Sequence, residues 1–98
     1  MIKHIVLFKM KDESTPDDIK KLAGELESLK ESTDGLMAEC EVAKDVMRTE
    51  RSYDLCLYSK FKTVEDVKKY GDHPNHVKVL ETVKELCSAA VKVDYPVD

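Results

Sequence analysis

The chain has 98 residues, 42% of them hydrophobic and 37% charged, with a formal net charge of −4; residues 1–98 are expected to form a single domain. The negative charge and the absence of a basic run exclude nucleic acid and anionic membrane surfaces as expected partners. Because no apolar run reaches the roughly 20 residues that span a bilayer and no signal-peptide pattern opens the chain, the sequence predicts a cytoplasmic protein.

The first third of the chain predicts a strand followed by a helix. Residues 2–10 are rich in β-branched and aromatic side chains, which is typical of a strand. Ser14 or Thr15 can cap the helix, and Pro16 suits its first turn. The segment "STDG", residues 32–35, ends it. The helix presents one apolar stripe made of Ile19, Leu22, Ala23, Leu26 and Leu29.

Three further strands are predicted from alternation and composition. Residues 36–47 alternate small apolar side chains with glutamates, so one face is apolar and the other polar. Residues 53–61, "YDLCLYSKF", and residues 89–95, "AAVKVDY", are rich in strand-forming side chains.

Two helical pieces are predicted between the last two strands. Thr63, followed three residues later by an aspartate, resembles a capping box. The first piece runs to about Tyr70 and ends at Gly71. The second starts near Pro74 and runs to about Cys87.

The order βαββαβ predicts an α+β, ferredoxin-like fold: a four-stranded antiparallel sheet with its helices on one face. The first strand is apolar on both sides, with Val6 and Phe8 on one and Ile5 and Leu7 on the other. An uncovered apolar face needs a partner, and a second copy is the simplest one. We therefore expect a homodimer with a barrel-like interface, in which Ile5 and Leu57 are candidates to face the partner.

The stretch "YGDHPNH", residues 70–76, holds two of the three histidines. At 100° per residue, His76 lies in the middle of an apolar stripe with Leu80, Val83 and Cys87. It also lies in the first turn of its helix, where the helix dipole and burial both favour the neutral imidazole, an available general base. The opposite, solvent side of this helix is expected to carry Lys78, Glu81, Thr82 and Glu85.

Two more polar groups are expected near His76. The break between Gly71 and Pro74 turns Tyr70 back toward the same space, where its phenol can donate a hydrogen bond to a carbonyl or enolate oxygen. His4, on the strand face that carries Val6 and Phe8, would add a third polar group.

Other interpretations of these residues stay open. His73 or Asp72 can cap the second helix and Pro74 can open it, so the motif can be helix punctuation alone. A histidine on an apolar stripe can be a satisfied core residue. His73 and His76, three residues apart, can share a metal, but no carboxylate completes such a set, and neither metal nor cofactor is expected.

The three cysteines, Cys40, Cys56 and Cys87, are odd in number and far apart, and no C-x-x-C pair is present. This pattern predicts buried, reduced thiols without a disulfide or a metal. Cys40 and Cys56 are expected on neighbouring strands.

Three segments, "HIVLFKMKDE" at the start, "YGDHPNHV" in the second helical region and "VDYP" near the end, resemble the stress-responsive A/B barrel (Dabb) family. The resemblance covers nearly the whole chain. It implies a dimeric α+β barrel of ferredoxin-like topology.

The resemblance extends to the plant polyketide cyclases of this family that form olivetolic acid. It implies that Tyr70 and His76 match the tyrosine–histidine pair of these enzymes, which carry out an aldol cyclisation without metal or cofactor. The resemblance also matches His4 to a further histidine of the cyclase pocket and His73 to the first histidine of the cyclase H-P-x-H motif. The chain departs from the cyclase pattern by aliphatic or small residues where the cyclase has a histidine or aromatic pocket residues: Leu22, Ala23, Leu26, Leu55 and Cys87.

Two hypotheses follow for function. The first is a cofactor-independent acid–base enzyme acting on a small carbonyl compound by aldol or lyase chemistry, with His76 as base and Tyr70 stabilising the enolate oxygen. The alternative is a non-catalytic small-molecule-binding or stress-response module. In either case the expected pocket wall consists of His4, Val6, Phe8, Leu22, Leu26, Leu55, Leu57, His73 and Leu80.

Overall fold

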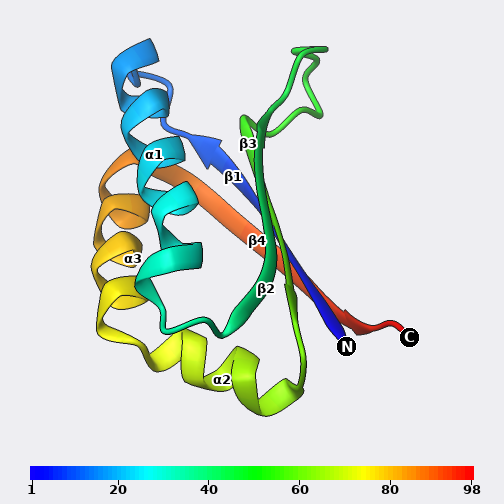
Figure 1. Ribbon diagram of the computed structural model, residues 1–98. Helices are drawn as coiled ribbons and strands as arrows, with labels where there is room; N and C mark the ends of the chain where they lie inside the picture. The colour runs from blue at the N-terminus through cyan, green and yellow to red at the C-terminus, as the bar shows by residue number, and fades with distance from the viewer.

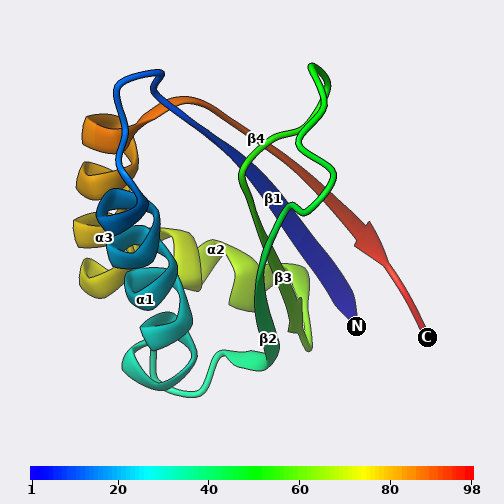
Figure 2. The same cartoon turned by 90° about the horizontal axis from the view of Figure 1, so that it is seen from above.

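The computed structural model describes residues 1–98, and its helices all lie on one face of a single four-stranded sheet (Figures 1 and 2). Neighbouring strands are antiparallel, in the order β2-β3-β1-β4. The elements are β1 (Ile2–Met10), α1 (Pro16–Ser32), β2 (Met37–Lys44), β3 (Leu55–Phe61), α2 (Val64–Asp72), α3 (Pro74–Leu86) and β4 (Cys87–Pro96). The predicted ferredoxin-like α+β fold is confirmed. None of the helices combines the length and apolar character needed to cross a bilayer.

Helix α1 begins with a complete capping box. The hydroxyl of Thr15 accepts from the backbone N–H of Asp18 at 3.2 Å, and the Asp18 carboxylate accepts from the backbone N–H of Thr15 at 3.0 Å. Thr15, rather than Ser14, is therefore the N-cap. The helix then buries Leu22, Leu26 and Leu29 against the sheet.

This cap gives a testable difference between two adjacent residues. Thr15→Ala is expected to lower the free energy of unfolding by about 1 kcal/mol, because it leaves backbone donors of the first turn without a partner. Ser14→Ala is the matched control and should change stability little, since the Ser14 hydroxyl does not cap the helix. Urea midpoints compare the two, and equal losses would contradict the assignment of the cap.

The strand register decides which side chains face the helices. Val6 of β1 lies opposite Leu57 of β3 and Lys92 of β4, and His4 lies opposite Asp94. Residues directly opposite on antiparallel strands share a face, so all five lie on the helical side. Leu57 is buried there, and the expectation that it faces a partner molecule is wrong. Its position agrees with the other expectation, which placed Leu57 in the pocket wall together with Val6.

The other face of the sheet is uncovered, and its centre is apolar, with Lys3 and Lys60 paired toward one end. Ile5 lies opposite Val93, and Leu7 lies opposite Cys56 and Val91. Leu7, Val91 and Val93 are 40%, 48% and 53% exposed. The expected second apolar face is therefore present, and Ile5 lies on it.

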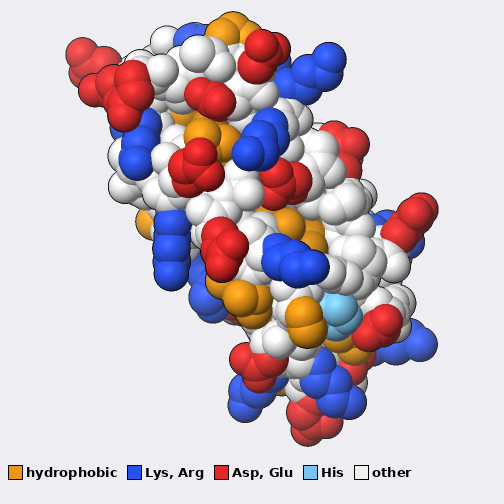
Figure 3. All heavy atoms as spheres, turned by 90° about the vertical axis from the view of Figure 1, so that its left-hand side faces the viewer, with side chains coloured by type: hydrophobic (Ala, Val, Ile, Leu, Met, Phe, Trp, Pro, Cys, Tyr) orange, Lys and Arg blue, Asp and Glu red, His pale blue; other side chains and the backbone are white.

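By contrast, the helical side of the molecule is strongly polar. Figure 3 shows acidic and basic side chains interspersed over this side, with small apolar areas between them. Charges of both signs are mixed rather than gathered into one patch. This side therefore has the character of a solvated surface.

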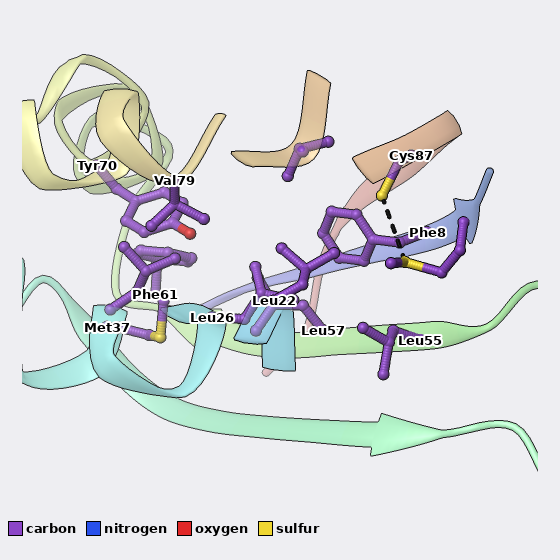
Figure 4. Packing of buried hydrophobic residues seen from close by; sticks show 13 residues of the cluster. Phe8, Leu22, Leu26, Met37, Leu55, Leu57, Phe61, Tyr70, Val79 and Cys87 are labelled. Atoms are coloured by element: carbon purple, nitrogen blue, oxygen red, sulfur yellow. Dashed lines mark hydrogen bonds between the residues drawn. The ribbon is translucent and has the colours of Figure 1, made fainter. Parts of the chain in front are cut away.

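The core lies between the helices and the sheet, and Figure 4 shows much of it at close range. Its members are aliphatic, aromatic and sulfur-containing side chains from every element: Phe8, Met10, Leu22, Leu26, Leu29, Met37, Leu55, Leu57, Phe61, Tyr70, Val79, Val83 and Cys87.

One residue joins the two helical pieces. His73 is both the C-cap of α2, through its backbone N–H to Tyr70 O at 3.1 Å, and the N-cap of α3.

Gly71 lies inside α2 rather than ending it, since α2 continues to Asp72. Strand β4 begins directly at Cys87, because the chain passes from helix to strand without a connecting loop.

Two smaller expectations need correction. Thr63 caps α2 by accepting from the backbone N–H of Asp66, without the reciprocal bond of a full capping box.

Among the cysteines only Cys87 is buried, while Cys40 and Cys56 are half-buried, and all three are free thiols. Burial raises the pKa of each thiol.

Candidate functional site

A cavity of about 370 Å³ lies between the helices and the sheet. Its wall is mostly aliphatic, with side chains from α1, α3 and β1. This volume is at the lower end of the range for small-molecule sites. The polar side chains in the wall are His4, Tyr70, His76 and Lys92.

His76 is half-buried in this wall. Its Nδ1 lies 3.0 Å from the backbone carbonyl oxygen of Gly71. A carbonyl only accepts, so Nδ1 carries the proton and, in the neutral ring, Nε2 carries the lone pair. Burial lowers the pKa of His76, the bond to Gly71 opposes this, and the charges of His4 and His73 lower it further. At neutral pH the residue is therefore a neutral imidazole with Nε2 as its basic atom.

The rotation of α3 differs from the expected one. Val79, Thr82 and Val83 are its buried residues, and the Thr82 hydroxyl donates to Glu25 Oε1 on α1 at 2.7 Å. Thr82 was expected on the solvent side and is buried because α1 supplies this acceptor. His76, three residues before Val79, is about 60° away around the helix. It lies on the flank of the buried stripe that borders the cavity rather than in its middle.

Tyr70 contacts His76 directly. The two ring centroids are 4.4 Å apart, and the centroid of Phe61 is 5.1 Å from that of Tyr70. Figure 4 shows Tyr70 beside Phe61 and Val79. Only 2% of the residue is exposed, and burial raises the pKa of its phenol. The hydroxyl is therefore a protonated donor at neutral pH.

The Tyr70 hydroxyl has no hydrogen-bond partner within the chain, yet no side-chain polar atom is both fully buried and unpartnered. The oxygen therefore keeps some accessible surface although the residue is almost completely covered. A tyrosine that serves only as a core residue normally has its hydroxyl paired. The free phenol of a cavity-lining tyrosine is instead available to a bound molecule.

His4 is the third polar side chain of the site, after His76 and Tyr70. Its ring centroid is 6.0 Å from that of Tyr70, and its Nδ1 is hydrogen-bonded to Asp94 Oδ1. The other oxygen of Asp94 accepts from Lys92 Nζ at 2.5 Å. Partial burial by itself raises the pKa of Asp94, but the bonds from Lys92 and His4 outweigh it and lower the pKa.

The lowered pKa of His76 predicts a pH dependence of stability. The folded pKa lies below the ordinary value of 6.5. Between these two values the unfolded chain binds more protons than the folded one, so acidification lowers the free energy of unfolding. This loss begins near pH 6.5 and ends at the folded pKa.

Urea midpoints measured across this window should fall more steeply with decreasing pH for the wild type than for His76→Gln, which cannot titrate. Asp94 does not interfere, because its pKa is lowered from 3.8 and it titrates in a more acidic window. Parallel curves for the two proteins would contradict the burial effect on His76.

The structure brings most of the sequence-predicted site residues together. Tyr70, His76 and His4 line the same cavity, as do five predicted apolar residues. These five are Val6, Phe8, Leu26, Leu57 and Leu80.

Three predicted pocket residues do not line the cavity. Leu22 and Leu55 are packed in the core, away from the cavity wall. His73 caps α3: its Nδ1 accepts from the backbone N–H of Asn75 at 3.1 Å, and its Nε2 lies 2.9 Å from Asp34 Oδ2. For Nδ1 to accept, Nε2 must carry the proton and donate to Asp34.

The wall also contains residues that sequence reasoning missed, from α1, α2, α3 and β4. The alternation of Val91 and Val93 with Lys92 and Asp94 was the available signal for β4, because it turns the two charged side chains inward. No three His, Cys, Asp or Glu side chains come together in a group that could hold a metal. The missed wall residues are Leu29, Val67, Gly71, Val79, Val83, Ala90, Val91 and Lys92; of these, Val91 borders the cavity although the register with Leu7 places it on the outer face of the sheet.

Comparison with known sequences gives a family match over almost the whole chain. The family model of the Stress responsive A/B Barrel Domain matches residues 2–97. A stress-response A/B barrel domain-containing protein of Arabidopsis thaliana is 29% identical over 100% of this chain and 37% of its own length. The chain spans less than half the length of the curated relatives that it matches.

Comparison with solved structures finds the same fold. A dimeric protein of unknown function from Bacteroides fragilis, described as ferredoxin-like, is 30% identical, with a TM-score of 0.79 over 96% of this chain and 93% of that chain. The hydroxynitrile lyase from Passiflora edulis has a TM-score of 0.86 over 99% of this chain and 93% of that chain. Its identity is 17%, so this likeness concerns the fold alone.

Proposed function

The chain belongs to the stress-responsive A/B barrel domain family, and on that premise we propose that its cavity binds a small carbonyl compound on which His76 and Tyr70 act as base and hydrogen-bond donor. The observation that carries the proposal is the contact between a neutral imidazole and an unpartnered phenol in the wall of one cavity. No metal or cofactor is part of the proposed reaction.

The proposed step is proton removal next to a carbonyl group. Nε2 of His76 takes the proton, the C–H electron pair moves into the carbonyl, and the negative charge develops on oxygen. The Tyr70 hydroxyl stabilises that oxygen by donating a hydrogen bond. The enolate carbon can then attack a second carbonyl, as in an aldol reaction, or the bond from the β-carbon to a leaving group can break, as in a lyase reaction. In either case the protonated His76 returns its proton to the new alkoxide or to the departing group.

The aliphatic wall supports this assignment. An apolar surrounding of low dielectric strengthens the hydrogen bond from Tyr70 to a developing oxyanion. The same environment lowers the pKa of His76 and so keeps its basic atom unprotonated at neutral pH. His4 is proposed to hold or orient the substrate from the opposite wall of the cavity.

We propose further that the protein is a homodimer formed through the outer face of the sheet. Leu7, Val91 and Val93 are exposed on this face, and the 30% identical protein from Bacteroides fragilis is described as dimeric. Two such faces packed together would remove this apolar surface from water.

A second candidate function is binding without catalysis. The packing of Tyr70 between Phe61 and His76 favours it, because aromatic side chains held in this way also make a rigid pocket wall. In this case the cavity would hold a small molecule in a stress response, and neither Tyr70 nor His76 would move a proton.

Deuterium exchange of a simple ketone separates the two functions. Benzylacetone, an apolar ketone, is incubated in deuterated buffer with the protein, and proton NMR follows the loss of signal from the carbons next to the carbonyl. Acceleration over buffer alone is expected for the acid–base function. Binding of the ketone, seen as shifted amide signals around the cavity, without acceleration would support the binding function and contradict the catalytic one.

A further inference from the structure

A lysine lies in the wall of the mostly aliphatic cavity. The register of β4 turns Lys92 to the helical side of the sheet, opposite Val6, and its side chain lines the cavity while remaining 62% exposed. An ammonium at this position is at the rim, in contact with both the cavity and solvent. Lysine commonly reaches such a boundary by laying its apolar stem along the wall.

The cavity wall carries one basic side chain and no acidic one. Lys92 is the only wall residue with a permanent charge, and no aspartate or glutamate belongs to the wall. Asp94, just outside it, has both of its oxygens engaged, one by His4 and one by Lys92. An ammonium has three donors, and Asp94 uses one of them, so donors remain for a ligand.

We infer that the cavity selects small amphipathic anions, with Lys92 binding the anionic head at the rim and the aliphatic wall holding the apolar body. This inference rests on the proposed function and narrows it, since the carbonyl compound would carry a carboxylate or a similar head group. The Asp94 carboxylate holds the ammonium in place at the rim. The head group would lie at the rim while the reactive carbon lies deeper, beside Tyr70 and His76.

The test uses three probes with the same apolar chain: octanoate, octyl sulfate and octanol. Their dissociation constants are measured by titration calorimetry at low ionic strength, and amide NMR shifts locate each of them. We compare wild type with Lys92→Met, which keeps the apolar stem, and with Lys92→Arg, which keeps the charge. Lys20→Met, at an exposed position on α1, is the control for net charge.

Lys92→Met is expected to raise the dissociation constants of the two anionic probes about three- to fivefold, as for the loss of a partly exposed ion pair. The dissociation constant of octanol should not change. Lys92→Arg and Lys20→Met should retain wild-type affinity for them. The difference in anion affinity between wild type and Lys92→Met should become smaller as salt is added. The ratio of octanoate to octyl sulfate binding tells whether a carboxylate or a sulfate-like head is preferred.

The outcomes separate this inference from the function beneath it. If octanol binds in the cavity and Lys92→Met leaves the affinity for both anions unchanged, the inference on anions is overturned while a small-molecule cavity stands. If none of the three probes shifts the signals of Tyr70 and His76, both the cavity function and the inference are overturned.

Discussion

His76→Ala is expected to lower the rate of benzylacetone exchange by about 10²–10⁴-fold, the range that a well-placed general base contributes. The reason is that the variant removes Nε2, the basic atom proposed to take the proton. Tyr70→Phe should cause the smaller loss, because the base remains and only one donor to the enolate oxygen is removed. Both variants must be checked for native secondary structure and unchanged oligomeric state.

His73→Asn is the matched control for this experiment. His73 lies outside the cavity wall and caps α3, and asparagine is among the best N-cap residues. The variant should therefore keep a rate close to that of the wild type. A comparable loss in His73→Asn and His76→Ala would indicate that helix position, rather than the base, is what matters.

The pH profile provides an independent check on the base. An unperturbed histidine is half protonated at about pH 6.5, and the pKa of His76 is below that value. The exchange rate should therefore stay above half of its plateau at pH 6.5 and reach half of it only at lower pH. A profile that falls at higher pH would point to another group.

Leu7→Glu is expected to dissociate the proposed homodimer. Leu7 lies on the outer sheet face between Cys56 and Val91, and a charge placed in an apolar interface without a partner costs several kcal/mol. A cost of about 3 kcal/mol weakens association by about 10²-fold. Light scattering or sedimentation should show monomers at concentrations where the wild type is dimeric.

The control for this change is Val46→Glu, which also replaces an exposed aliphatic residue by glutamate. Val46 is 85% exposed in the loop between β2 and β3, outside the sheet. It should leave the dimer intact. A wild-type protein that is monomeric at micromolar concentration would remove the basis for the dimer altogether.

The fold was predictable because local and long-range signals agree. The capping residues around α1 and α2, the apolar stripe of α1 and the alternation in the strands all indicate the same βαββαβ arrangement. The helix stripe, the break after Tyr70 and the strand alternation predicted that Tyr70, His76 and His4 share one site, the family resemblance indicated the same residues, and the structure brings their rings together. Their roles in a reaction remain a proposal.

The details that were wrong or missed depend on contacts between elements distant in sequence. The buried side of α3 is fixed by Thr82 reaching Glu25 on α1, and the period of α3 alone could not reveal that partner. Leu22 and Leu55 lie in the core because the packing of α1 on the sheet closes over them. The inward position of Lys92 and Asp94 depends on how β4 pairs with β1, a register that composition does not fix.

The shared cap at His73 has a mechanical consequence for the site. Because one residue ends α2 and begins α3, no flexible linker separates Tyr70 from His76. The backbone bonds from His73 N–H to Tyr70 O and from Val77 N–H to His73 O tie the two turns together. The two helices therefore meet at a hydrogen-bonded elbow, and a displacement of this elbow from the sheet would carry both side chains with it. Widening the entrance to admit a ligand would then change access to the cavity while the spacing of the tyrosine and the histidine stays constant.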